Sequence, residues 1–245
     1  MRNIKLTVEY DGKRYLGWQR LGDSEKTVQG KIEKVIEIMV EEKIEIIGSG
    51  RTDAGAHARG QVANFKTEST MSLDDMLEYL NRYLPNDIVV NDIEEVPERF
   101  HSRYNAKEKT YSYNVWNSTI PSVFNGMHSF HYFDELDMGL MEEAAEKLVG
   151  THDFLAFSAL KKSKKSTERT IKEISITQEG NLIKFSFVGD GFLYNMVRIL
   201  MGTLLQIGSG ERPMESIGEA LTSRKREDAG PTAPSHGLFL EEVVY

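Results

Sequence analysis

The residues best suited to chemistry lie in one glycine-rich segment, residues 48–57, with the sequence GSGRTDAGAH. Its glycines allow another molecule to approach the backbone closely, and Arg51 stands two residues before Asp53. A neighbouring guanidinium favours the ionised form of a carboxyl group, which suits a nucleophile or a base rather than a proton donor. We therefore predict Asp53 as the reacting group, although Asp and Gly are also common in ordinary turns.

Other kinds of site fit the sequence less well. Two glycines in the segment have the spacing of a phosphate-binding loop, but the Lys and hydroxyl residue that should follow are missing. A serine nucleophile is not supported, since no G-x-S-x-G motif occurs. His128 and His131 have no thiolate or matching carboxylate cluster beside them in the sequence, so we expect no metal site.

Length and composition describe an ordinary globular protein of one large domain or two smaller ones. The 245 residues include no cysteine, which excludes disulfides and thiolate chemistry and fits a reducing compartment. No long apolar run or signal-peptide core is present, and we expect a cytoplasmic protein. The net charge of −8, from 30 basic and 38 acidic residues, disfavours a polyanionic partner. This value is an average over the whole chain and does not describe each segment. Acidic residues concentrate in 134–146 and basic ones in 161–172.

Hydrophobic periodicity predicts the secondary structure and the fold class. The first half is predicted as β-α-β-β-α-β, with elements at 4–10, 28–40, 44–47, 61–66, 73–84 and 88–93. The second half repeats this order, with elements at 111–115, 137–149, 171–177, 182–188, 192–207 and 238–244, and a short helix at 213–221. This order predicts an α+β fold of two ferredoxin-like halves, residues 1–104 and 105–245, with mixed, mainly antiparallel sheets flanked by helices.

Five separated motifs also resemble one protein family. Residues 51–62 (RTDAGAHARGQV) are similar to the catalytic motif of the TruA-type tRNA pseudouridine synthases. The other similar stretches follow in the family's order, at 10–19, 100–113, 192–198 and 233–238. The departures are mild: Ala56 stands where the family usually has Val, and the lysine-rich loop 158–168 has no clear counterpart.

The resemblance implies an isomerase that converts uridine in RNA to pseudouridine in a cleft between the two halves. Asp53 corresponds to the nucleophile, which attacks either C1′ of the sugar or C6 of the base. Tyr111 corresponds to the tyrosine that stacks on the target base, and Arg51 to the arginine that extrudes the nucleotide. Arg198 corresponds to a partner of Asp53 in the cleft, and Leu238 to a residue on its apolar side.

The resemblance further implies tRNA as the substrate, modified at positions 38, 39 and 40 of the anticodon stem-loop. It implies a homodimer and a reaction without cofactor or metal. Recognition of adjacent positions suggests contacts to RNA shape and backbone rather than to base edges. Candidate backbone contacts are the basic residues Lys13, Arg14, Arg20, Lys107, Lys109, Lys161, Lys162, Lys164, Lys165 and Arg169.

A non-catalytic RNA-binding module is the alternative hypothesis, because paired ferredoxin-like halves also describe tandem RNA-recognition domains. The chain lacks the aromatic-rich strand motif expected of such domains. This alternative also gives no reason for Asp53 in a glycine-rich loop, and a small-molecule enzyme would not explain the lysine cluster.

Overall fold

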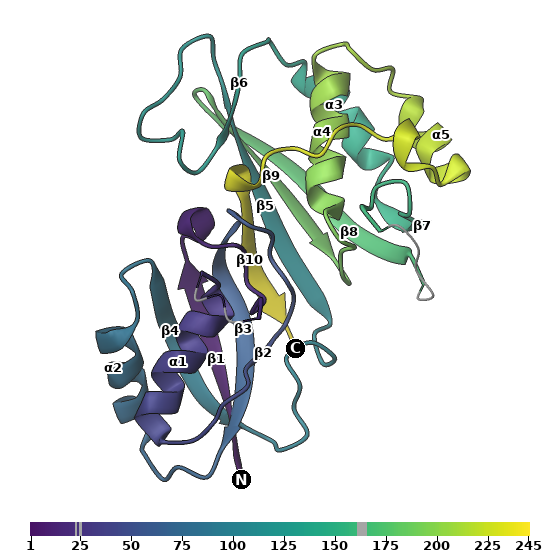
Figure 1. Cartoon of the computed structure of the whole chain (residues 1–245). Helices are drawn as coiled ribbons and strands as arrows, with labels where there is room; N and C mark the ends of the chain where they lie inside the picture. The colour runs from purple at the N-terminus through teal and green to yellow at the C-terminus, as the bar shows by residue number, and fades with distance from the viewer. Residues whose placement is uncertain (23, 25, 161–165) are drawn as a thin grey trace. The chain divides into compact units, whose positions relative to one another are not determined.

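A computed structural model describes residues 1–22, 24, 26–160 and 166–245 (Figure 1). The chain divides into two compact units, Met1–Lys107 with Phe239–Tyr245, and Glu108–Leu238. The sequence-based division assigned everything after residue 104 to the second half. In the structure the last strand instead returns to the first unit, where it pairs with a strand of that unit's sheet.

The sheet of the first unit has the strand order β4-β1-β3-β10. These strands are Ile88–Val96 (β4), Arg2–Tyr10 (β1), His57–Thr67 (β3) and Leu238–Val244 (β10). β1 is antiparallel to both of its neighbours, whereas β10 runs parallel to β3 and pairs Phe239 with His57. The short strand β2, Ile47–Gly48, is antiparallel to β3. The segment around Asp53 thus runs from the short strand β2 to the long central strand β3.

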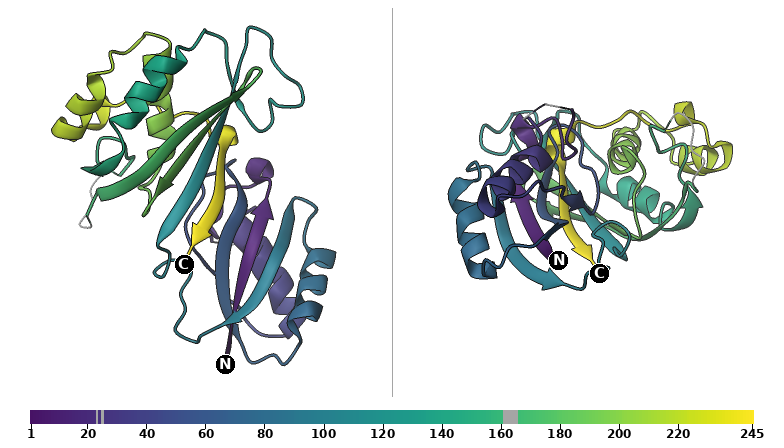
Figure 2. Two further views of the ribbon diagram at one scale, coloured as in Figure 1. Left: turned by 180° about the vertical axis from the view of Figure 1, so that it is seen from behind. Right: turned by 60° about the horizontal axis from the view of Figure 1, so that its bottom comes forward.

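Two helices, α1 (Val28–Val40) and α2 (Leu73–Tyr83), cover one face of this sheet (Figures 1 and 2). Both begin at a residue whose side chain caps the helix: Oγ1 of Thr27 accepts from the Gly30 amide, and Oγ of Ser72 accepts from the Asp75 amide. The apolar face of α1 is buried through Ile32 and Ile36. Packing of this face holds the helix against the sheet.

The second unit is an antiparallel sheet in the order β5-β9-β8-β7. Its strands are Glu108–Asn117 (β5), Leu182–Gly189 (β9), Glu168–Glu179 (β8) and Gly150–Asp153 (β7), with Phe130–Tyr132 (β6) parallel to β5. Helices α3 (Met138–Glu146) and α4 (Met196–Gly208) pack against each other, and α5 (Ser216–Ser223) follows. Short 3-10 helices occupy Gly12–Arg14, Arg226–Asp228 and Ser235–Gly237.

The predicted strand at 44–47 is largely wrong, for a reason visible in its backbone. The side chains of Ile44 and Ile46 are buried as expected. Their amides, however, donate to carboxylates of α1, Ile44 to Glu37 and Ile46 to Glu33, in place of a neighbouring strand. Only Ile47–Gly48 forms a strand. Helix α4 likewise begins later than predicted, because Asn195 before it has a left-handed φ of 61°.

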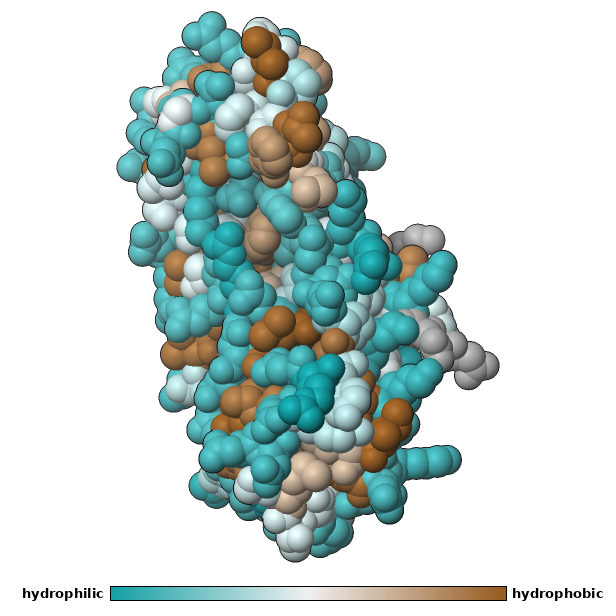
Figure 3. All heavy atoms as spheres, turned by 90° about the vertical axis from the view of Figure 1, so that its left-hand side faces the viewer, coloured by the Kyte–Doolittle hydropathy of each residue, from teal (hydrophilic) through white to brown (hydrophobic). Residues whose placement is uncertain are grey.

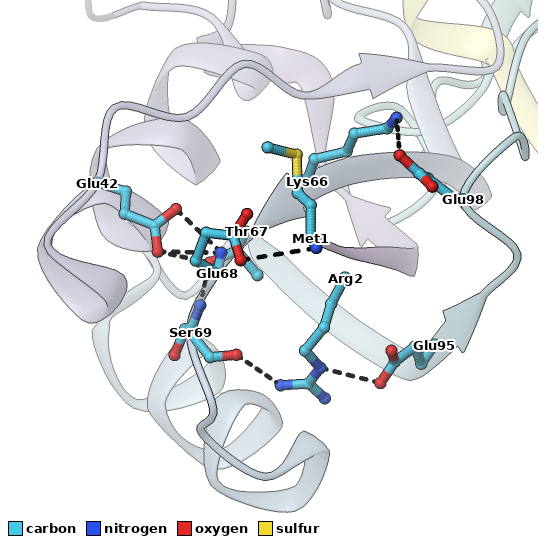
Figure 4. Close-up of polar contacts among 9 residues, drawn as sticks. All are labelled: Met1, Arg2, Glu42, Lys66, Thr67, Glu68, Ser69, Glu95 and Glu98. Atoms are coloured by element: carbon cyan, nitrogen blue, oxygen red, sulfur yellow. Dashed lines mark hydrogen bonds and ion pairs between the residues drawn. The ribbon is translucent and has the colours of Figure 1, made fainter.

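Two ion pairs and a hydrogen bond connect the start of β1 to residues at the ends of β3 and β4 (Figure 4). Arg2 pairs with Glu95 at 2.9 Å and donates to the carbonyl of Ser69, and the Met1 amino group pairs with Glu68. Such exposed pairs contribute little individually to stability. Among the described residues, no helix is both long and apolar enough to cross a lipid bilayer.

Candidate active site

Asp53 lies in the loop that joins β2 to β3, and its backbone forms a tight turn. The carbonyl of Asp53 accepts a hydrogen bond from the Ala56 amide at 3.1 Å. Gly55 has a φ of +80°, a conformation that glycine adopts without strain. Arg51 and Ala54 are exposed and Asp53 is half-buried, so its carboxylate sits at a surface that a substrate can reach.

The segment between β1 and α1 lies along this loop and holds it in place. The Trp18 amide donates to the carbonyl of Thr52 at 3.2 Å, and the Gly55 amide donates to the carbonyl of Tyr15 at 3.2 Å. These two bonds flank Asp53 on both sides in the sequence. They fix the backbone that carries the carboxylate without using the carboxylate itself.

Two glycines make this close approach possible. A Cβ at Gly12 would lie 1.8 Å from the carbonyl oxygen of Ala56. A Cβ at Gly17, which has a φ of +101°, would lie 2.7 Å from the carbonyl oxygen of Thr52. Both distances are far below van der Waals contact. The motif at residues 10–19 therefore acts as the backbone support of the Asp53 loop.

Two buried side chains, those of Tyr10 and Gln61, form hydrogen bonds to the loop. The hydroxyl of Tyr10 lies 2.7 Å from Oγ1 of Thr52, and burial raises the pKa of Tyr10 well above its ordinary value. Gln61 accepts from the hydroxyl of Ser49 at 2.7 Å and donates to the carbonyl of Gly50 at 3.0 Å. Polar groups of Ser49, Gly50 and Thr52, all before Asp53, are thus satisfied inside the protein, which favours a single geometry for this part of the loop.

His57, directly after the loop, is packed rather than exposed. Its Nδ1 accepts from the Gly12 amide at 3.1 Å and lies 3.0 Å from Oδ1 of Asp11. Its ring stacks on Phe239 with 4.6 Å between the ring centres. The histidine of the motif therefore joins the loop to the final strand, β10.

A series of side-chain hydrogen bonds through two glutamines orients Arg51. Its Nε donates to Oε1 of Gln19 at 3.1 Å, and Nε2 of Gln19 donates to Oε1 of Gln29 at 2.9 Å. Gln29 in turn donates to the buried carboxylate of Glu33 at 2.8 Å. The exposed guanidinium is consequently oriented by residues that extend into the body of the first unit.

The other predicted site residues belong to the second unit. Tyr111 is buried on β5, and its ring meets Phe192 edge-on at 5.2 Å. Nε of Arg198 donates to the carbonyl of Ala233 at 2.7 Å, and Nη1 donates to Oδ1 of Asn195 at 3.1 Å. The first of these bonds joins the motifs at 192–198 and 233–238, and the second lies within 192–198. The pairing of Arg198 with Asp53 and the role of Leu238 remain predictions.

Tyr113, two residues after Tyr111, has a structural environment. Its hydroxyl donates to the carbonyl of Pro234 at 2.7 Å, and burial raises its pKa strongly while the nearby Arg198 lowers it slightly. A Cβ at Gly237 would come within 2.9 Å of the Tyr113 ring. The motif at 233–238 therefore packs on Tyr113 within this unit.

The candidate RNA-backbone contacts differ in their surroundings. Arg14 pairs with Asp87 at 2.7 Å, and Arg20 pairs with Glu33 at 3.3 Å. Lys13 and Lys107 are exposed, whereas Lys109 and Arg169 are half-buried. The remaining candidates, Lys161, Lys162, Lys164 and Lys165, lie outside the described residues.

The sequence did not indicate the supporting roles of Tyr10, Gln19, Thr52 and Gln61. The signal was present, since all four lie within stretches that resemble the family's motifs. A motif, however, does not distinguish a residue that touches substrate from one that holds the loop.

Comparison with known proteins shows the family. The sequence model described as tRNA pseudouridine synthase matches residues 6–105 and 144–245. A tRNA pseudouridine synthase A from Bacillus sp. (strain KSM-64) is 51% identical over all 245 residues, with both chains fully covered. The chain belongs to the tRNA pseudouridine synthase family.

Further relatives agree over the same length. A tRNA pseudouridine synthase A from Acetivibrio thermocellus (strain ATCC 27405) is 47% identical, and a tRNA pseudouridine synthase A 2 from Bacillus cereus (strain ZK / E33L) is 45% identical. Both alignments cover the whole of each chain. The α+β pseudouridine synthase fold predicted from the motifs is confirmed, as is membership of a family of isomerases. The Asp53 loop lies in the first stretch that the family model matches, whereas Tyr111 lies between the two stretches.

Proposed function

We propose that this chain is a tRNA pseudouridine synthase that isomerises uridine at positions 38, 39 and 40 of the anticodon stem-loop. The main support for this proposal is the loop of Asp53, which neighbouring segments hold in place at a surface that a substrate can reach. Relatives that match the chain over its full length are named tRNA pseudouridine synthase A. Those relatives are named as enzymes, and an RNA-binding module without catalytic activity would leave the Asp53 loop unexplained.

The reaction breaks the bond between N1 of the base and C1′ of the sugar and forms a bond between C5 and C1′. The proton at C5 is released and N1 gains a proton, so atoms and electrons balance without a redox partner. Asp53 acts as the nucleophile, at C1′ or at C6, and leaves again when the new bond is complete. A glycoside hydrolase would use a second carboxyl group to activate water. The Asp53 loop carries one carboxylate, which suits an enzyme that retains both fragments.

The remaining site residues would capture the uridine after it leaves the RNA stack. Extrusion costs a few kcal/mol, and Arg51 would take the vacated place. Tyr111 would stack on the extruded base, an interaction worth about 1–3 kcal/mol that tolerates any base. Arg198 would neutralise Asp53 in the apolar surroundings of α4, and Leu238 would line the apolar side of the base.

Basic side chains would hold the RNA backbone. Lys13 and Lys107 are exposed, and the lysines of 161–165 would add four charges. Arg14 and Arg20 already pair with carboxylates, so each would exchange or share its partner on binding. The test is the salt dependence of tRNA binding, since each lost phosphate contact lowers the slope of log K against log salt by about one.

A homodimer would need an exposed surface, and the chain offers an apolar one between β5 and β6. Ile120, Val123 and Phe124 are 72%, 84% and 89% exposed. Figure 3 shows several hydrophobic residues near the top of the face that it draws. Exposed apolar groups of this kind often mark protein interfaces. Light scattering of the wild-type chain and of Phe124→Ser would test this surface.

The decisive experiment is release of tritium from C5 of uridine-labelled tRNA. Asp53→Asn keeps the size of the side chain but replaces the nucleophilic carboxylate with a neutral amide. We expect no detectable release and tRNA binding within about tenfold of wild type. Asp74→Asn, an exposed substitution on α2, is the matched control and should release tritium normally. Activity in Asp53→Asn would disprove the nucleophile assignment.

A further inference from the structure

A pocket of about 180 Å³ opens in the first unit beside Arg51, and Gln19 and Gln29 of the hydrogen-bonded series that orients Arg51 belong to its lining. Trp18, Gln19 and Arg51 line one wall. His101, Arg103 and Tyr104 line another, and the exposed Glu45 also belongs to the lining. The pocket thus brings two guanidinium groups together with the exposed ring of Tyr104 beside the proposed catalytic loop.

The turn that carries His101, Arg103 and Tyr104 is anchored by a buried polar network. Ser102 is completely buried, and both its amide and its hydroxyl donate to Oδ1 of Asn64, at 2.9 and 2.7 Å. Nδ2 of Asn64 donates to Oδ1 of Asn3 at 2.9 Å, and Nδ2 of Asn3 donates to the carbonyl of Phe100 at 3.0 Å. The hydroxyl of Tyr245 donates to the carbonyl of Ser102 at 2.7 Å. A fully satisfied network of this kind holds one geometry.

Of the three side chains that this turn contributes to the pocket, Arg103 and Tyr104 are exposed and His101 is half-buried. Tyr104 is 74% exposed, with its ring 4.2 Å from that of His101. The guanidinium of Arg103 makes no ion pair with any residue that the structure describes. Nδ1 of His101 accepts from the Arg103 amide at 3.1 Å, which places the proton of a neutral ring on Nε2. The turn therefore offers an aromatic face, a cation and a hydrogen-bond donor to a ligand.

We propose that this pocket binds one unpaired nucleotide of the RNA substrate, near the uridine that reacts at Asp53. Its base stacks on Tyr104 beside His101, and its phosphate pairs with Arg103. Aromatic faces combined with guanidinium groups are the usual means of binding unstacked RNA bases. The inference rests on the proposed function, because it takes the ligand to be the RNA that the enzyme modifies.

The size and charge of the pocket favour a single base over other ligands. Sites for whole small molecules usually enclose about 300–1,000 Å³, well above the volume of this pocket. Glu45 disfavours a free anion in the same space, whereas its carboxylate can accept from the amino or imino group of a base. Arg51 lines this pocket and lies two residues before Asp53 in the loop. A nucleotide held here would keep the strand in register with the reacting position.

The test measures binding of full-length tRNA to the full chain across a range of salt concentrations. Tyr104→Ala should weaken binding about tenfold to a hundredfold without changing the salt slope, since it removes stacking but no charge. Tyr104→Phe, which keeps the aromatic face, should bind within about twofold of wild type. Arg103→Ala should lower the slope by about one. Tyr83→Ala and Arg99→Ala, at exposed positions outside the pocket, should behave as wild type.

Two outcomes separate this inference from the proposed function. Wild-type binding affinity in Tyr104→Ala, together with an unchanged salt slope in Arg103→Ala, would overturn the nucleotide pocket even if wild-type enzyme releases tritium from uridine. Conversely, the expected binding changes without any tritium release by the wild-type chain would support the pocket and reject the proposed activity. Circular dichroism of each variant confirms that the fold is retained, as expected for exposed side chains.

Discussion

The hydroxyl of Tyr10, at the end of β1, lies 2.7 Å from Oγ1 of Thr52, the residue immediately before Asp53. Both side chains are buried, so neither hydroxyl can turn to bulk water for a replacement partner. The bond joins the central sheet directly to the backbone that carries the carboxylate. The position of Asp53 is therefore coupled to the stability of the first unit.

This coupling can be measured with a double-mutant cycle of Tyr10→Phe and Thr52→Val. Each single substitution should lower the free energy of unfolding by about 1–3 kcal/mol, because it leaves a buried hydroxyl with one partner fewer. The double variant should lose less than the sum, by about 1 kcal/mol. Urea denaturation gives the stabilities, and Tyr83→Phe at an exposed position is the control. Strict additivity would show that the two hydroxyls do not interact.

Gly12 provides a second test of the support beneath the loop. Gly12→Ala would place a methyl group 1.8 Å from the carbonyl oxygen of Ala56, so the backbone of one segment must move. We expect a loss of stability above about 2 kcal/mol and a loss of kcat of at least tenfold, since small misplacements of a reacting group are costly. Gly218→Ala in α5 meets no atom within 4 Å and should be neutral or slightly stabilising. Wild-type kcat in Gly12→Ala would contradict the proposed role.

Much of this architecture follows from local sequence patterns. Alternation at Ile4, Leu6 and Val8 predicts β1, and periodicity correctly predicts that the two helices of the first unit begin at Val28 and Leu73. These features depend on neighbours in the sequence, which a pattern records. Strand β10 is also predicted correctly as an element, but its pairing with β3 is not. That partner is about 180 residues away, and periodicity carries no information on such pairing.

In the candidate site too, features that depend on neighbouring residues could be predicted, whereas contacts between distant segments could not. Asp53 and Arg51 stand out by residue type and spacing, whereas their supports do not. The dependence of Gly12 on Ala56, and of Ser102 on Asn64, exists only once distant segments meet. The short strands β6 and β7 escaped prediction because three or four residues give too little alternation to recognise.

Asn64 is the centre of the network beneath the turn at 101–105. Asn64→Ala would remove the acceptor of the Ser102 amide and hydroxyl and the donor to Asn3. We expect a loss of about 2–4 kcal/mol, since several buried polar groups lose their partners together. Amide hydrogen exchange at Ser102 should accelerate by more than the global loss of stability explains. Asn91→Ala, which removes only an exposed bond to Glu9, should leave both measurements unchanged.

The raised pKa of Tyr15 predicts how the stability of the first unit changes at alkaline pH. Burial, reinforced by the hydrogen bond that its hydroxyl donates to Asp87 at 2.6 Å, raises its pKa from 10 to about 12. Because the folded pKa is raised, the stabilising contribution is complete below about pH 10 and is lost as the pH rises through 12. Tyr15→Phe has no hydroxyl to ionise, so its stability should fall less steeply than that of wild type across this interval. Burial also raises the pKa of Tyr10, Tyr113 and Tyr245, but these residues are present in both proteins and cancel in the comparison. Urea unfolding at a series of pH values gives both curves, and parallel curves would show that Tyr15 ionises as readily in the folded protein as in the unfolded chain.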